Sequence, residues 1–174
     1  VFLLVFLKAT SQEFTGFQLL EKSIKFPDPE ALWPMFKANF NVTMKSPNKP
    51  PRKSRVEVDS LKSFFKLSMD QKGNKLVSTI NNNDCSLSFN GDAAFSEEIA
   101  KEFRLTCERV SMYKNYYTYL YGLPMKLKDK GAIVDSNVTQ RSVNGISYWV
   151  LKTTYTPEVG SDTWYFYFDK NTYQ

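Results

Sequence analysis

Residues 56–80 read VEVDSLKSFFKLSMDQKGNKLVSTI, and this stretch decides the fold class. Apolar residues alternate with polar ones, first at Val56 and Val58 and then at Phe65, Leu67 and Met69. A period of two indicates strands that bury one face. The turn signal QKGN then separates these strands from a further one at 76–80. So short a turn predicts antiparallel hairpins and argues against parallel strands joined by helical crossovers.

The strand pattern recurs on both sides of this segment. Apolar and polar residues alternate over 36–43, and apolar residues alternate with serines over 85–89. In the last third, strands at 137–143 and 146–156 meet across Asn144-Gly145, a strong hairpin signal. Another strand is predicted at 163–168, where aromatic residues fall on both faces, so we expect both faces to be covered.

Two regions have helical periodicity. The first covers 15–24, with Thr15 as a candidate N-cap. The second begins at Ser96, is expected to break near Thr106, and ends at Gly122, which is predicted to be a left-handed C-terminal cap. Helices combined with antiparallel strands predict an α+β fold, and the length predicts a single domain over 12–174.

The second helical region ends in YYTYLYGLP at residues 116–124. Tyr117, Leu120 and Tyr121 fall on one helix face, whereas Tyr116 and Tyr119 fall on another. A helix that is apolar on most sides must be enclosed or must face a cavity. Two interpretations follow: a packed core, or a ring-lined groove that leaves the tyrosine hydroxyls at its mouth.

The amino-acid composition argues against some classes of function. Of the 174 residues, 42% are hydrophobic and 16% are aromatic, which is enough for a substantial core. The lack of histidine removes the commonest general base and, with only two cysteines, argues against a metal site. A hydrolase that uses paired carboxylates stays open as an alternative. Its candidate acids are Asp59, Asp70, Asp129, Asp135, Glu158, Asp162 and Asp169.

The first residues indicate export. Residues 1–7 form an apolar run too short to span a bilayer, and small residues follow at Ala9 and Ser11. We therefore predict that residues 1–11 are the remnant of a signal peptide, the alternative being a buried strand. No cysteine lies at the predicted cleavage point to accept a lipid anchor. In an oxidising compartment Cys85 and Cys107 can pair, although two separate buried thiols are the alternative.

Residues 45–55, KSPNKPPRKSR, carry five basic residues and three prolines without an acidic residue. The simpler interpretation is a solvated hairpin loop that proline keeps open. The functional interpretation is a rim in transient contact with a membrane surface, through anionic lipid headgroups, or with an acidic partner. Nucleic acid is not an expected partner of an exported protein.

Two blocks carry a family resemblance: LTCERVSMYKNYYTYLYGLPMKLKD at 105–129 and DTWYFYFDKNTY at 162–173. They resemble a family of uncharacterised exported proteins of Gram-negative bacteria with a LolA-like, lipoprotein-carrier-like half-barrel. The resemblance implies a strongly curved antiparallel sheet, open on one side, with helices packed on its concave side. It also implies further strands beyond residue 174, so the chain is predicted to be truncated at its C-terminus. A shared half-barrel does not by itself imply lipoprotein carriage.

The main hypothesis is a monomeric periplasmic or otherwise exported carrier that uses no cofactor. It would bind a hydrophobic ligand, such as the acyl chains of a lipid or lipoprotein, against aromatic residues. The predicted ligand-binding residues are Phe65, Leu67, Trp149, Trp164 and Phe166 on the sheet and Tyr117, Leu120 and Tyr121 on the helix. A register slip of one residue would exchange each sheet residue for its neighbour. The alternatives are the paired-carboxylate hydrolase and a structural module of the envelope with a packed core.

Overall fold

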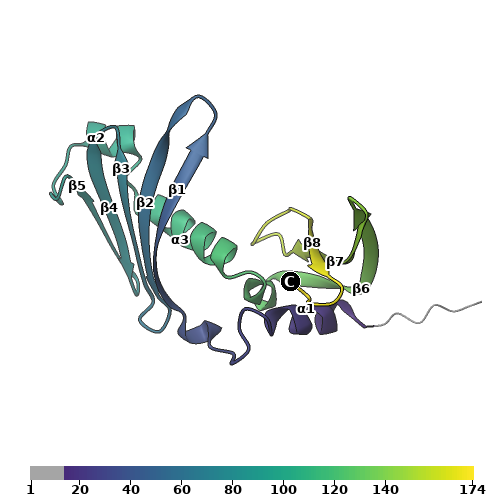
Figure 1. Ribbon diagram of the computed structural model, residues 1–174. Coiled ribbons are helices and arrows are strands. Elements are labelled where there is room, and N and C mark those ends of the chain that lie inside the picture. The colour runs from purple at the N-terminus through teal and green to yellow at the C-terminus, as the bar shows by residue number, and fades with distance from the viewer. Residues whose placement is uncertain (1–13) are drawn as a thin grey trace, which may run out of the picture. The chain divides into compact units, whose positions relative to one another are not determined.

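The computed structural model describes residues 14–174 (Figure 1). The predicted signal peptide at 1–11 lies outside the described residues. The described chain divides into two compact units, one formed by 14–31 with 123–174 and the other by 32–122. The single domain expected over 12–174 stays a prediction, and each unit is described by itself. Within residues 14–174, no helix is both long and apolar enough to cross a membrane.

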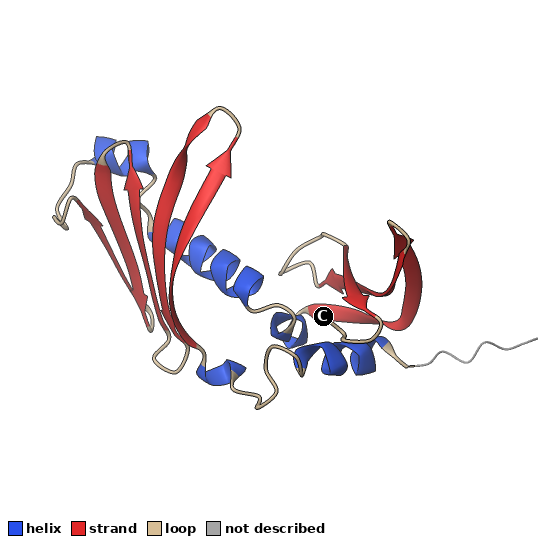
Figure 2. Cartoon of the chain, viewed as in Figure 1, coloured by secondary structure: helices blue, strands red, loops and turns tan. Residues whose placement is uncertain are grey.

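The 32–122 unit is built on a five-stranded antiparallel sheet whose strands pair in chain order. Its strands are β1 (Lys37–Ser46), β2 (Lys49–Asp59), β3 (Phe64–Gln71), β4 (Asn74–Asn81) and β5 (Asp84–Phe89). The short 3-10 helix η1 (Trp33–Met35) precedes the sheet, and helices α2 (Glu97–Phe103) and α3 (Cys107–Tyr121) follow it (Figure 2). The meander predicted from residues 56–80 is confirmed.

The register places the alternating apolar positions of this meander on one face, whereas Phe64 and Val77 lie on the other. Val58 lies opposite Phe65, which in turn lies opposite Ile80. These three side chains are buried, whereas the intervening Glu57 pairs with Lys66 on the other face. The predicted sheet residues Phe65 and Leu67 therefore lie on the apolar face, without a slip of one residue.

Helices α2 and α3 begin where the sequence predicts. The Ser96 hydroxyl accepts a hydrogen bond from the Ile99 amide, and the Thr106 hydroxyl accepts one from the Arg109 amide, so each caps its helix. The helix breaks at Arg104, which has a left-handed conformation. Gly122 ends α3 with φ −98°, so the prediction of a left-handed cap there is wrong. The helix ends in an ordinary turn, with the Gly122 amide donating to the Tyr119 carbonyl.

The basic segment 45–55 forms an exposed hairpin, as the sequence predicts, but most of it is strand, so the prediction of an open loop is wrong. The turn between β1 and β2 holds only Pro47 and Asn48. Pro50 and Pro51 lie within β2 because β3 pairs with β2 only from Ser54 onward. Before Ser54 the strand lies at the edge of the sheet, where a proline removes no bond to β3.

The second unit, 14–31 with 123–174, packs one helix on a three-stranded antiparallel sheet in the order β6-β7-β8. Its elements are α1 (Gly16–Ile24), the 3-10 helix η2 (Met125–Lys128), β6 (Ala132–Val143), β7 (Ile146–Tyr155) and β8 (Trp164–Asp169). The Thr15 cap and the Asn144-Gly145 hairpin are confirmed, and Thr15 forms a capping box with Gln18. Leu19 and Leu20 of α1 share a buried cluster with Leu151 of β7.

The outer strand of this sheet is more exposed than the sequence predicts. Trp164 is 47% exposed and Tyr165 is 44% exposed, whereas Phe168 is buried. The expectation that β8 is covered on both faces is therefore wrong for the described residues. The α+β class with antiparallel sheets is confirmed by both units.

Candidate ligand-binding surface on helix α3

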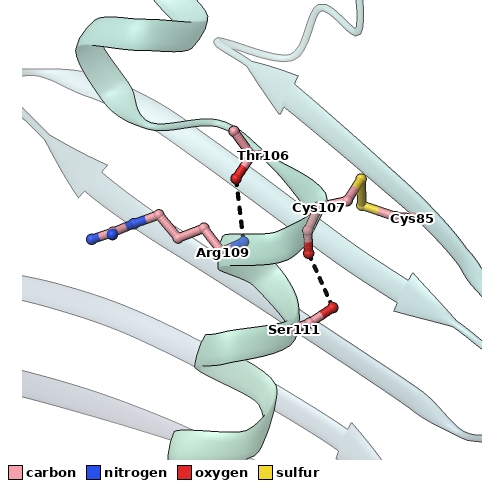
Figure 3. The surroundings of a disulfide bond; sticks show 5 residues. All are labelled: Cys85, Thr106, Cys107, Arg109 and Ser111. Atoms are coloured by element: carbon pink, nitrogen blue, oxygen red, sulfur yellow. Dashed lines mark hydrogen bonds between the residues drawn. A yellow bond between two sulfur atoms is a disulfide. The ribbon is translucent and has the colours of Figure 1, made fainter.

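A disulfide fixes the start of helix α3 to the sheet. Cys107, the first residue of α3, is joined to Cys85 on β5 (Figure 3). On the same turn of helix, the Ser111 hydroxyl donates to the Cys107 carbonyl at 3.0 Å. The Arg109 side chain extends on the opposite side of the helix from Cys85 (Figure 3). The covalent link and the Thr106 cap make α3 a rigid platform for the side chains that it presents.

Three tyrosines form a stacked series along α3. The ring centroid of Tyr117 lies 6.1 Å from that of Tyr113 and 6.4 Å from that of Tyr121. Tyr117 also stacks on Phe65 of β3, at 6.5 Å, and Tyr121 packs against Phe40 of β1, at 4.6 Å. Spacing of four residues places these rings one above another on the helix. The series joins the buried core at Tyr117 to the surface at Tyr121.

Beside the buried residues Val110, Tyr113 and Tyr117, helix α3 carries apolar side chains that reach the surface. Tyr116 is 53% exposed, Leu120 is 43% exposed and Tyr121 is 49% exposed. We name these three residues the α3 apolar surface. Because the α3 backbone lies closest to β4 and β5, the apolar side chains of β1 are less well covered, and Met44 is 42% exposed. Large apolar side chains gathered at the surface are typical of a ligand or partner site.

Two arginines from different elements meet at Tyr113 on α3. Arg109 and Arg52 both donate to the Tyr113 hydroxyl oxygen, at 3.0 Å and 3.2 Å. Their guanidinium groups also lie near the Tyr113 ring, at 5.1 Å and 5.6 Å from its centroid. These residues line a pocket of about 380 Å³ between the β1–β2 hairpin and the two helices. The complete lining is Met44, Ser46, Lys49, Pro50, Arg52, Gln71, Glu102, Phe103, Arg104, Arg109 and Tyr113.

The buried tyrosine between these two regions stays neutral. Removal from water raises the pKa of the Tyr117 phenol above its usual value, and the positive charge of Arg52 opposes part of this rise. Tyr117 therefore remains protonated throughout the physiological range. Its ring supports the stacked series, and it does not supply a proton or a charge for chemistry.

The predicted ligand-binding residues divide between the two units. In the 32–122 unit, Phe65, Leu67 and Tyr117 are buried in one packed core, whereas Leu120 and Tyr121 reach the surface. In the other unit, Trp149 is buried, Phe166 is partly buried, and Trp164 is exposed beside Phe166 at a centroid distance of 6.4 Å. The exposed members can touch a ligand directly, whereas the buried members support them from below.

Sequence reasoning missed three residues of the candidate site: Phe40, Arg52 and Arg109. Arg52 has a signal in the sequence, because it continues the alternation of Ser54, Val56 and Val58 and so belongs to the apolar face of β2. Arg109 lies four residues before Tyr113, the spacing at which helical side chains meet. The partnership of Arg52 with Tyr113 has no local signal, because it depends on the packing of α3 on the sheet.

Four of the seven candidate carboxylates of the hydrolase alternative have local structural partners. Asp59 pairs with Lys37 and Asp129 pairs with Lys126. Asp135 accepts a hydrogen bond from the Asn137 amide at an irregularity of β6, and Asp169 accepts one from the Asn171 amide in the turn after β8. Across residues 14–174, the structure contains no group of three or more histidine, cysteine, aspartate or glutamate side chains that could hold a metal ion.

The fold and the site define an α+β protein whose candidate site is an aromatic and basic helix surface on an antiparallel sheet. The chain belongs to a family described as a family of unknown function (DUF6503), whose model matches residues 1–174. No curated protein matches the chain, and no solved structure matches it.

Proposed function

We propose that this protein is a binding or carrier protein for a hydrophobic ligand and that acyl chains of a lipid or lipoprotein lie against the α3 apolar surface. The observation that carries the proposal is the exposure of Tyr116, Leu120 and Tyr121, at 43% to 53%, on a helix that already fills the core with other side chains, those of Val110, Tyr113 and Tyr117. A helix that needed only to plug the sheet would present polar residues at these positions.

The energetics of such a surface suit a reversible carrier. Covering roughly 200 Å² of apolar surface contributes about 5 kcal/mol before the cost of immobilising the ligand. The disulfide and the Thr106 cap already hold α3 in place, so little further ordering of the protein opposes binding. A partner or membrane that offers more apolar surface would then draw the ligand away.

The exported, periplasmic setting and the LolA-like half-barrel belong to the same proposal. They are supported by the signal-like residues 1–11, by the resemblance of 105–129 and 162–173 to an uncharacterised exported family with a LolA-like half-barrel, and by the antiparallel sheets with packed helices. The basic residues of β2 favour transient contact of this hairpin with an anionic membrane surface.

Native mass spectrometry of the gently purified protein, followed by lipid extraction, tests the proposal. We expect a co-purifying lipid that is lost in Leu120→Ser. The matched control is Leu61→Ser, which makes the same change at an exposed leucine in the turn between β2 and β3. A protein that is consistently empty and also ignores fluorescent fatty-acid probes would contradict the proposal. Equal loss of lipid from both variants would place the ligand elsewhere.

A further inference from the structure

The basic pocket between the β1–β2 hairpin and helices α2 and α3 has a chemistry different from that of the α3 apolar surface. We propose that it binds a phosphate group. This goes beyond the proposed function, because the pocket can take free phosphate whether or not an acyl chain binds along α3. It is supported by the charge balance of the lining, by the geometry around Tyr113, and by a buried donor without a well-placed acceptor.

The charge balance of the lining is strongly positive. Four of its side chains are cations and one is an acid: Lys49, Arg52, Arg104 and Arg109, against Glu102. The Glu102 carboxylate is already bound to Lys72, outside the lining, with an N–O distance of 2.7 Å. Among the described residues, none of the four lining cations has an ion pair of its own. Unpaired cations gathered in one concave site favour an anionic ligand.

The geometry around Tyr113 brings two of these cations together. Arg52 and Arg109 donate to one phenol oxygen from opposite elements, the sheet and the helix. Two guanidinium groups held this close repel each other, and an anion between them would convert the repulsion into two attractive contacts. The Tyr113 O–H, whose oxygen already accepts from both arginines, can donate to the same anion.

The Arg52 Nε is also buried. It makes no hydrogen bond of good geometry among the described residues, although the Arg52 side chain also interacts with the neutral Tyr117 phenol. A buried N–H without a well-placed acceptor costs free energy, so a site that contains one favours a ligand with several acceptor oxygens. A phosphate group offers such oxygens in several directions, and the planar donor fork of arginine matches two of them at once.

The helix spacing suggests how a phosphorylated amphiphile would use both surfaces. Arg109, Tyr113, Tyr116 and Leu120 follow one line along α3 at intervals of four, three and four residues. Arg109 and Leu120 are therefore separated by about 16 Å along the axis. A phosphate in the pocket would leave an attached alkyl chain free to run along Tyr116 and Leu120.

Calorimetric titration of the full chain with inorganic phosphate tests the inference, with dodecyl phosphate below its micelle concentration as a second arm. We expect saturable binding of one phosphate, weakened at least tenfold in Arg52→Gln. The matched control is Arg55→Gln, which removes the same charge from the same strand but from its polar face, where Arg55 pairs with Glu57. Binding in Arg55→Gln should stay within twofold of wild type.

Absence of saturable phosphate binding overturns the inference, and so does an equal loss in Arg52→Gln and Arg55→Gln, which would indicate general charge attraction. If circular dichroism shows that Arg52→Gln is unfolded, Arg109→Gln replaces it under the same criteria. If dodecyl phosphate binds more tightly than inorganic phosphate and Leu120→Ser removes this gain in affinity, the phosphate belongs to a lipid headgroup. If the two ligands bind with equal affinity, the pocket takes free phosphate. Phosphate binding without lipid binding supports the inference and rejects the proposed function; the reverse result rejects the inference alone.

Discussion

The backbone carbonyl oxygen of Asp135 on β6 occupies the space that a Cβ atom at Gly16, the first residue of α1, would need. The absence of a side chain therefore lets α1 approach the strand closely. We expect Gly16→Ala to lower the free energy of unfolding by about 2 kcal/mol because of overpacking, although alanine favours helix. Urea denaturation measures the change. Gly160→Ala is the matched control, since a Cβ there meets no atom within 4 Å, and a similar loss in both variants would contradict the explanation.

A second prediction concerns the core of the 32–122 unit. It compares the stability cost of truncating a buried and an exposed residue of the predicted ligand-binding set. Leu67 is completely buried on β3, whereas Leu120 is 43% exposed on α3. We expect Leu67→Ala to cost about 2 to 5 kcal/mol of stability and Leu120→Ala less than about 0.5 kcal/mol. Chemical denaturation of the two variants checks this difference. A large cost at Leu120 would show that the α3 apolar surface is part of the core, and that would weaken the carrier proposal.

Strand positions in the 32–122 unit could be predicted because one face of its sheet is buried. The alternation at Val56 and Val58 and that at Phe65 and Leu67 require the same face to be apolar, which also fixes the register. The basic pocket could not be predicted in this way. Arg52 and Tyr113 are 61 positions apart, and only the crossing of α3 over the sheet brings them together.

The wrong predictions for three segments have physical explanations. Pro50 and Pro51 are typical loop residues, yet β2 tolerates them because β3 does not reach this part of β2 and the pairing with β1 is irregular between Met44 and Ser46. From the sequence, Trp164 is expected to be buried because β8 has aromatic residues on both faces. Its burial depends on which element packs against its own face of β8, and the local sequence does not encode that packing. Glycine can adopt the left-handed conformation easily but is not obliged to, and Gly122 has a negative φ in the structure.

The disulfide leads to a prediction about the 32–122 unit. Cys85 and Cys107 are separated by 22 positions, so the cross-link restricts a short loop of the unfolded chain. In the chain-entropy model, the double variant Cys85→Ser/Cys107→Ser should lose roughly 3 kcal/mol of stability. Denaturation of this variant and of reduced wild type, with free thiols counted in each, makes the measurement. Wild-type stability that does not change on reduction would mean that α3 is held by its packing alone.

The turn after β8 predicts a dependence of stability on pH. The Asp169 carboxylate accepts hydrogen bonds from the backbone amides of Thr172 and Asn171 and from the Thr172 hydroxyl, and these bonds lower its pKa below the usual value. Because the pKa is lower in the folded state, the charged carboxylate stabilises the fold above its unfolded pKa of about 3.9, and this contribution is lost as pH falls through the folded value.

We therefore expect Asp169→Asn to be less stable than wild type near neutral pH and the difference to narrow as pH falls below about 4. Urea denaturation at a series of pH values measures the difference, and an NMR titration of the carboxyl group locates the folded pKa. Asp162→Asn, at an exposed position in the loop before β8, serves as the control and should follow wild type across the series. A gap between Asp169→Asn and wild type that does not change with pH would mean that the shape of the turn, and not the charge of Asp169, stabilises it.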